Sequence, residues 1–167
     1  SPDGNFFKNV DGGIRYSNGI HIINTVSSPS YTYEIKDNTF SPAPKRAIRI
    51  EGSQGYKLIQ GNLFDAKSNV SSGINFKNSS GFKIYGNQFN ILYYGIEVEN
   101  SGLGGGNIGF PGGNIFTNCS YNSSIVTTGL TPGNPYLQIK CNDFNNSLSA
   151  YYRTNTSHSK DLSNNIF

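Results

Sequence analysis

Charged residues are scarce: Asp, Glu, Lys and Arg together make up only 14% of the 167 residues, and the net charge is +3. The basic residues are dispersed, and no basic run is longer than Lys45-Arg46. Nucleic-acid-binding proteins usually gather their basic residues on one face, so this dispersion argues against a nucleic-acid partner. No apolar stretch is as long as a membrane-spanning helix, so the sequence predicts no membrane span.

Cysteine and histidine are almost absent, which limits the metal chemistry that the chain can support. The chain has only Cys119, Cys141, His21 and His158 and no C-x-x-C motif, so we expect neither a metal nor a cofactor. The two cysteines take different positions in the repeat described below, five residues after one marker Asn and one residue before another. We therefore expect two buried free cysteines rather than a disulfide.

Small polar and aromatic residues take the place of charged ones, with 23 Asn, 21 Ser and 20 Gly besides 11 Phe and 11 Tyr. So many aromatic residues at a low net charge are not typical of a disordered chain. Aromatic residues favour strands, whereas Asn, Ser and Gly favour turns. The composition therefore indicates many short strands joined by many turns.

An internal repeat is marked by the tripeptide Asn-x-Phe. Seven of the 11 Phe residues belong to it, at Asn5/Phe7, Asn38/Phe40, Asn62/Phe64, Asn87/Phe89, Asn114/Phe116, Asn142/Phe144 and Asn165/Phe167. Successive markers are 33, 24, 25, 27, 28 and 23 residues apart, which is the period of a repeat architecture.

Two further markers alternate apolar and polar residues over four to six positions. One precedes the Asn, as in Tyr56-Lys57-Leu58-Ile59 and Phe82-Lys83-Ile84-Tyr85, and the other lies between, as in Gly73-Ile74-Asn75-Phe76 and Gly95-Ile96-Glu97-Val98. Such alternation is the period of a half-buried strand. Three short strands in a repeat of about 25 residues, with no helix, predict an all-β fold, a right-handed parallel β-helix. We expect a single-stranded solenoid of about six coils, in one domain spanning residues 1–167.

The marker residues have physical roles in such a coil. Asn tolerates the left-handed backbone conformation, so we expect the marker Asn at a sharp turn, where its side chain can hydrogen-bond from coil to coil. The Phe two residues later is expected to point inward and to stack on the Phe of the next coil. Because each strand pairs with its copy about 4.8 Å away, the column from Phe40 to Phe144 would run along the axis.

The pattern G-I-x-(V/I/F)…(F/Y)-K-(I/L)-x-x-N-x-(I/L)-F resembles the right-handed parallel β-helix repeat of the pectin-lyase-like superfamily. The stretch Asn107-Ile108-Gly109-Phe110-Pro111-Gly112-Gly113-Asn114-Ile115-Phe116 is similar to a variant common in large bacterial surface proteins of that group. The resemblance covers nearly all of the chain and implies the fold. The resemblance does not indicate which activity the chain has, because the superfamily includes lyases, hydrolases, phage tailspikes, adhesins and non-catalytic modules.

The chain begins within a coil, at Gly4-Asn5-Phe6-Phe7, and ends on the marker Asn165-Ile166-Phe167. Solenoids need polar capping repeats at both ends. We therefore expect the chain to be a fragment of a longer protein, with further coils or domains of that protein as its neighbours.

In this superfamily, active sites usually lie on or beside the outer face of one sheet, so the outward positions of the Gly-Ile strand are candidates. One column is expected to contain His21, Arg49, Asn75, Glu97 and Val126, and the next Ile23, Glu51, Lys77, Glu99 and Thr128. Glu97 and Glu99 lie two positions apart on one strand, about 7 Å, and are the best catalytic carboxylate pair available. The second column equally predicts ordinary charge pairing between strands.

The superfamily's polygalacturonases use clustered Asp residues, and its pectate lyases use acidic calcium ligands with a basic residue. The six Asp residues of this chain are dispersed, with no two closer than eight residues. Arg49 would stand where a lyase base stands, but the acidic calcium partners are missing. A non-catalytic role is therefore favoured.

Exposed aromatic side chains beside polar groups are suited to sugar binding. We expect the outer face around Arg49, Asn75 and Glu97, flanked by Tyr93 and Tyr94, to contact a polysaccharide or a cell-surface glycan. The sequence thus predicts a non-catalytic segment of a bacterial secreted or cell-surface protein, acting as a rigid spacer or an adhesive surface. The alternatives are a fragment of a polysaccharide hydrolase or lyase and a segment of a trimeric phage tailspike.

Overall fold

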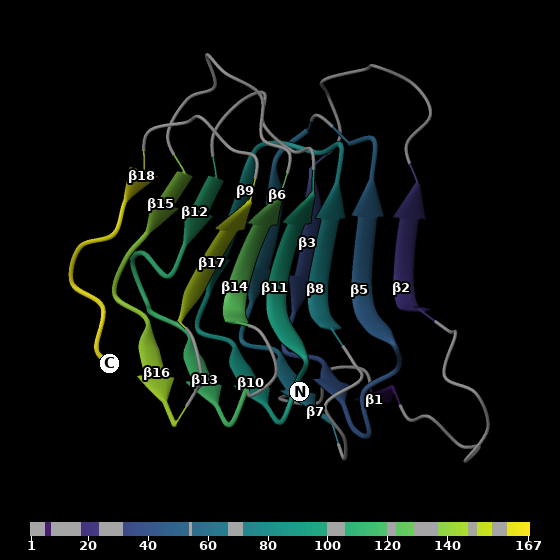
Figure 1. Cartoon of the computed structure of the whole chain (residues 1–167). Coiled ribbons are helices and arrows are strands. Elements are labelled where there is room, and N and C mark those ends of the chain that lie inside the picture. Colours follow the sequence, from purple (N-terminus) through teal and green to yellow (C-terminus); the bar gives the residue numbers. More distant parts are fainter. Residues whose placement is uncertain are drawn as a thin grey trace.

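The computed structural model describes residues 6–7, 18–23, 32–53, 55–66, 72–99, 106–119, 123–128, 137–146, 150–154 and 160–167. These residues form 18 strands and no helix, so the predicted all-β class is confirmed. The strands make three parallel sheets of six, and each sheet takes every third strand of the chain (Figure 1). The chain therefore passes through the three sheets in turn, which is the predicted parallel β-helix.

The sheets differ in the length of their strands, and Figure 1 shows the longest strands side by side, from β2 to β17. This long sheet consists of β2 (Asn18–Ile23), β5 (Arg46–Glu51), β8 (Ser72–Lys77), β11 (Tyr94–Glu99), β14 (Ser123–Thr128) and β17 (Tyr151–Thr154). The Ile sheet consists of β3 (Tyr33–Lys36), β6 (Lys57–Gln60), β9 (Phe82–Tyr85), β12 (Gly106–Ile108), β15 (Leu137–Ile139) and β18 (Lys160–Asp161). The Phe sheet consists of β1 (Phe6–Phe7), β4 (Thr39–Phe40), β7 (Leu63–Asp65), β10 (Gln88–Asn90), β13 (Ile115–Thr117) and β16 (Asp143–Asn145). None of the described residues forms a helix long and apolar enough to cross a membrane.

The Phe markers form the expected inward column. Phe40, Phe64, Phe89, Phe116 and Phe144 are buried, and successive rings stack with their centroids 4.7 to 5.1 Å apart. The strands that hold them pair in the register that the repeat predicts, with each Phe opposite the Phe of the next coil. The predicted column is therefore confirmed.

The marker asparagines form a buried ladder beside this column. Asn62 Oδ1 accepts hydrogen bonds from the backbone N and from Nδ2 of Asn38, both at 3.0 Å, and Asn62 Nδ2 donates to Asn87 Oδ1 at 3.0 Å. The same side-chain bond joins Asn87 to Asn114, Asn114 to Asn142 and Asn142 to Asn165. Each coil is thus tied to the next at this corner, as predicted.

The expected backbone conformation of the marker Asn was wrong. Positive φ angles of 54° to 67° occur one residue earlier, at Asp37, Gly61, Gly86, Gly113, Cys141 and Asn164. The preceding residue makes the left-handed turn, and the marker Asn can then direct its amide along the ladder. Asn5 lies outside the described residues.

Two glycines allow the Phe column to approach the long sheet. A Cβ atom at Gly73 would lie 2.8 Å from the Phe89 ring, and one at Gly95 would lie 2.6 Å from the Phe116 ring. Neither distance is possible for a real side chain, so these positions require glycine. The contact fixes β8 and β11 against the core and so places the outward residues Asn75 and Glu97.

The two cysteines are free, as predicted. Only Cys119 is fully buried, and burial raises the pKa of its thiol to about 11. Cys141 is half-buried at the left-handed position of its turn. The expectation that both are buried therefore holds for Cys119 alone.

Candidate ligand-binding face

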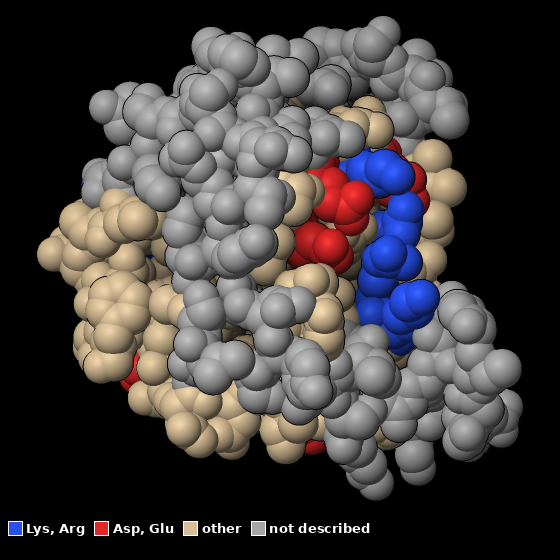
Figure 2. All heavy atoms as spheres, viewed as in Figure 1, with Lys and Arg blue, Asp and Glu red and all other residues tan. Residues whose placement is uncertain are grey.

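The outward side chains of three adjacent strands form a charged surface on the long sheet. The predicted columns are confirmed, because Asn75 pairs with Arg49 and with Glu97, and Lys77 pairs with Glu51 and Glu99. We call the set the polar face, which consists of Arg46, Arg49, Glu51, Asn75, Lys77, Glu97 and Glu99. Figure 2 shows a group of acidic side chains over β11, next to a column of basic ones over β5 and β8, whereas Glu51 belongs to β5.

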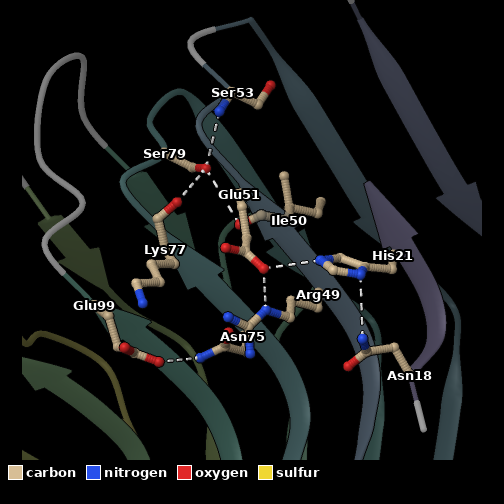
Figure 3. A network of polar contacts seen from close by, with 10 residues as sticks. All are labelled: Asn18, His21, Arg49, Ile50, Glu51, Ser53, Asn75, Lys77, Ser79 and Glu99. Carbon is tan, nitrogen blue, oxygen red and sulfur yellow. Dashed lines mark hydrogen bonds and ion pairs between the residues drawn. The ribbon is translucent and has the colours of Figure 1, made fainter. Parts of the chain in front are cut away.

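On β5, Glu51 joins two basic groups (Figure 3). Its Oε1 atom accepts a hydrogen bond from Arg49 Nε on the same strand and lies 2.8 Å from His21 Nε2 on β2. Asn18 Nδ2 lies 3.2 Å from the other ring nitrogen of His21, so both nitrogens of this imidazole are engaged. The hydrogen bond from Arg49 is the main reason that the pKa of Glu51 is lowered to about 2. Glu51 thus pairs with Arg49 and His21, in place of the charge pairing with Lys77 that the sequence suggested.

Because of this pairing, the stability of the folded chain should depend on pH in the acidic range. Because the pKa of Glu51 is lower in the folded chain than its ordinary value of 4.5, its contribution is complete above about pH 4.5 and is lost as the pH falls towards 2. Glu51→Gln should lower the free energy of unfolding at pH 7 by about 1 kcal/mol, since the group is partly solvated. Urea denaturation at a series of pH values should show the two proteins converging below about pH 2.

The matched control is Glu34→Gln, because Glu34 forms an exposed ion pair with Lys36, 2.6 Å apart, on the Ile sheet. A constant difference between Glu51→Gln and the wild type from pH 7 to 2 would contradict the assignment.

On β8 and β11, one amide joins two carboxylates. Asn75 Nδ2 donates to Glu97 Oε2 at 2.9 Å and to Glu99 Oε1 at 2.7 Å. Burial raises the pKa of Glu97, and the neighbouring charge of Glu99 raises it further. Burial and repulsion outweigh the lowering effect of Arg46 on that pKa.

Asn75 departs from its predicted role. Its side chain has no exposed surface, so it does not form part of the solvent-accessible surface that a glycan would meet. It instead holds Glu97 and Glu99, which are both half-buried, in fixed positions. Alternation along the strand predicted that Asn75 points outward, but its burial depends on the larger side chains around it.

Tyr94 begins β11 and Tyr93 immediately precedes it, so both lie where the sequence predicts, leading into the strand of Glu97. Their rings meet edge to face, with centroids 4.5 Å apart and an interplanar angle of 77°. Both side chains are half-buried. The pair thus lies three and four residues before Glu97, at the beginning of the strand that holds Glu97 and Glu99, and we call it the aromatic border of the polar face.

Arg46 is the member of the polar face that sequence reasoning missed. It begins β5 and pairs with Ser72, which in turn pairs with Tyr94. On β5, the two columns predicted from the sequence include Arg49 and Glu51 but not Arg46, which lies three residues before Arg49. Following the register back to the start of the strand would have placed Arg46 in the Tyr94 column.

The comparisons with known proteins agree with the fold. A family model described as Periplasmic copper-binding protein (NosD) matches residues 2–166. No curated protein and no solved structure matches the chain.

The copper named in that description finds no fitting set of ligands among the residues that the structure describes. Proteins bind copper chiefly through thiolate, thioether and imidazole groups. The sequence has no Met, and the buried Cys119 keeps its proton because its pKa is raised to about 11. In the part of the chain that the structure describes, no three His, Cys, Asp or Glu side chains converge. His158 lies outside the described residues.

Proposed function

Because the chain belongs to the NosD family, and is thus a β-helical segment of a periplasmic or surface protein, we propose that it is a non-catalytic module that contacts a polysaccharide or a cell-surface glycan. The contact surface consists of the polar face without the buried Asn75, together with Tyr93 and Tyr94. One observation carries the proposal: guanidinium donors on β5 and carboxylate acceptors on β11 lie in register on either side of β8, beside an aromatic border.

The donors and acceptors of this surface suit hydroxyl groups. Arg46 and Arg49 on β5 are half-buried, so their side chains are partly open to solvent and offer guanidinium donors. Glu97, two strands away, offers carboxylate oxygens. A sugar hydroxyl both donates and accepts hydrogen bonds, so it can serve either group. Two strand spacings amount to about 10 Å, a span that a polymer bridges better than a single small molecule.

The aromatic border and the rigid scaffold add to this fit. A tyrosine offers a flat apolar surface on which a sugar ring can pack and a hydroxyl group that can hydrogen-bond to the sugar's own hydroxyl groups. The stacked Phe column and the Asn ladder hold each coil against the next, so the surface is organised before a ligand arrives. Such preorganisation lowers the entropic cost of binding. The same stiffness supports a role as a spacer between other parts of a longer protein.

A glycan array followed by calorimetry tests the proposal. We expect at least one polysaccharide to bind, and Tyr94→Ala and Glu97→Gln each to weaken it about tenfold, equivalent to about 1.4 kcal/mol. Glu34→Gln, on the outer face of the Ile sheet, should leave the affinity unchanged and serves as the control. If a glycan binds and both polar-face variants bind it as the wild type does, the polar face is the wrong surface.

A glycoside hydrolase is the second candidate, and the environment of Glu97 favours it. Glycosidases use two nearby carboxyl groups, of which one keeps its proton because its pKa is raised. Glu97 and Glu99 share one amide donor, and the pKa of Glu97 is raised. Release of reducing sugar by the wild type, abolished in Glu97→Gln with binding retained, would show that the non-catalytic proposal is wrong.

A further inference from the structure

The turn between β12 and β13 has an apolar tip, which consists of Phe110, Pro111 and Gly112. These three consecutive residues are exposed, and Phe110 is 52% exposed. None of them has a polar side-chain atom. A single exposed apolar residue is common on protein surfaces, but this one differs in its rigid support and in the charge of its surroundings.

The backbone of the turn is fixed against the coils on both sides. Gly109 N donates to Ile84 O of the preceding coil at 2.7 Å, and Phe110 N donates to Asn107 Oδ1 at 3.1 Å. Gly109 has a φ angle of 107°, and a Cβ atom there would lie 1.9 Å from Lys140 O of the following coil. Only glycine fits between these coils. The Phe110 ring therefore projects from a fixed turn, which lowers the entropic cost of binding through it.

Basic side chains flank the apolar tip on the Ile sheet. Lys83 is exposed on β9, opposite Asn107 of the coil that holds the turn. Lys140 directly follows β15, in the next coil. Away from the long sheet, the one acidic residue that the structure describes in these three coils is Asp143, which lies on the Phe sheet. The Ile sheet beside the tip is therefore positively charged.

We propose that this corner of the β-helix binds the surface of a membrane that contains anionic lipids, with Phe110 in the interface and Lys83 and Lys140 at the headgroups. An aromatic ring enters the boundary between headgroups and acyl chains, while nearby lysines lay their stems on apolar surface and direct their ammonium groups to the phosphates.

A saccharide fits the apolar tip less well, because the tip offers its hydroxyl groups no hydrogen-bonding side chain. One ring and two lysines give weak and reversible membrane binding, so vesicles are needed at high lipid concentration. The apolar tip is separate from the polar face, which lies on the long sheet. The two proposals therefore stand or fall separately.

The chain has no tryptophan, which allows a direct test. Phe110→Trp introduces a single tryptophan at the apolar tip, and its fluorescence is followed during titration with vesicles of phosphatidylglycerol and phosphatidylcholine in equal amounts. We expect the emission to shift to the blue and to be quenched by brominated acyl chains, because the indole moves into the interface. Ile23→Trp is the matched control, since Ile23 is 60% exposed on β2 of the long sheet, and its emission should not change.

Co-sedimentation with the same vesicles measures the two contributions in a chain without tryptophan. Phe110→Ala should lower the partition coefficient about tenfold, because it removes the apolar surface that enters the interface. Lys83→Gln and Lys140→Gln should each lower it about fivefold, because each removes one positive charge beside the anionic surface. Lys77→Gln, on the long sheet, should leave it unchanged.

The proposal is overturned if the emission of Phe110→Trp does not shift, if pure phosphatidylcholine vesicles shift it equally, or if Phe110→Ala binds as the wild type does. A shift caused by the polysaccharide of the proposed function would assign the apolar tip to a glycan. A shift that grows with protein concentration in the absence of lipid would assign it to a second copy of this chain. Either result also overturns membrane binding, and neither a positive nor a negative vesicle result changes the status of the polar face.

Discussion

Phe89→Ala should lower the free energy of unfolding by about 3–5 kcal/mol, the range for removing a fully buried aromatic ring. Phe89 has no exposed surface and lies in the middle of the Phe column. Its ring centroid lies 4.8 Å from that of Phe64 and 4.7 Å from that of Phe116. The variant removes both stacking contacts and leaves a cavity beside Gly73, whose missing side chain makes room for this ring.

Urea denaturation followed by circular dichroism measures the loss. Phe110→Ala is the matched control, because Phe110 is 52% exposed and its truncation should change the stability by only about 0.5 kcal/mol. Phe89→Leu should lie between the two, since it keeps most of the buried apolar surface without the stacking. A loss of only a few tenths for Phe89→Ala, about that of the control, would contradict the continuous column.

The column could be predicted from the sequence because it depends on two local properties. Alternation along each strand decides which side chains point inward, and the Asn-x-Phe spacing decides which coil each Phe belongs to. Parallel pairing then places equal positions next to one another, as it does for Phe64 and Phe89. The same reasoning placed Asn75 between Arg49 and Glu97.

Burial was harder to predict, because it depends on neighbouring coils rather than on the strand itself. Asn75 points outward by its position in the strand and yet has no exposed surface. Its contacts come from Glu97 and Glu99, which lie 22 and 24 residues away in the sequence. No pattern within one repeat contains that information, so the sequence identified every member of the polar face except Arg46 but not which of them are exposed to solvent.

In the Ile sheet, the repeat pattern aligns one coil with the next one residue out of register. The sequence pattern treated Tyr56 as the aromatic marker that corresponds to Phe82. The register instead pairs Lys57 with Phe82, and Tyr56 is 40% exposed. A lysine therefore occupies an inward position that Phe82 and Leu137 occupy in other coils.

Lys57 is a charged residue buried in this core, and its replacement should also lower the free energy of unfolding strongly. The side chain has no exposed surface, and Nζ donates to the backbone carbonyls of Ser53 (2.7 Å), Gly55 and Ser80. These carbonyls belong to the segments that follow β5 and β8, so one ammonium group joins two coils. Lys57→Met fills a similar volume but leaves buried carbonyls without this donor, which should lower the free energy of unfolding by about 2–4 kcal/mol.

The pH dependence distinguishes a buried ammonium from a packing effect. Burial lowers the pKa of Lys57 from 10.5 to about 8, so the folded chain releases this proton at a lower pH than the unfolded chain does. Between about pH 8 and 10.5 the unfolded state binds more protons, and the stability that Lys57 contributes therefore rises with pH.

Urea denaturation of the wild type and Lys57→Met at pH 7, 8, 9 and about 10 should give a difference in stability that grows above about pH 8. Because both proteins contain the same tyrosines and other lysines, their titration cancels in this difference. A difference that stays constant from about pH 7 to 10, or that shrinks, would show that Lys57 acts by packing alone.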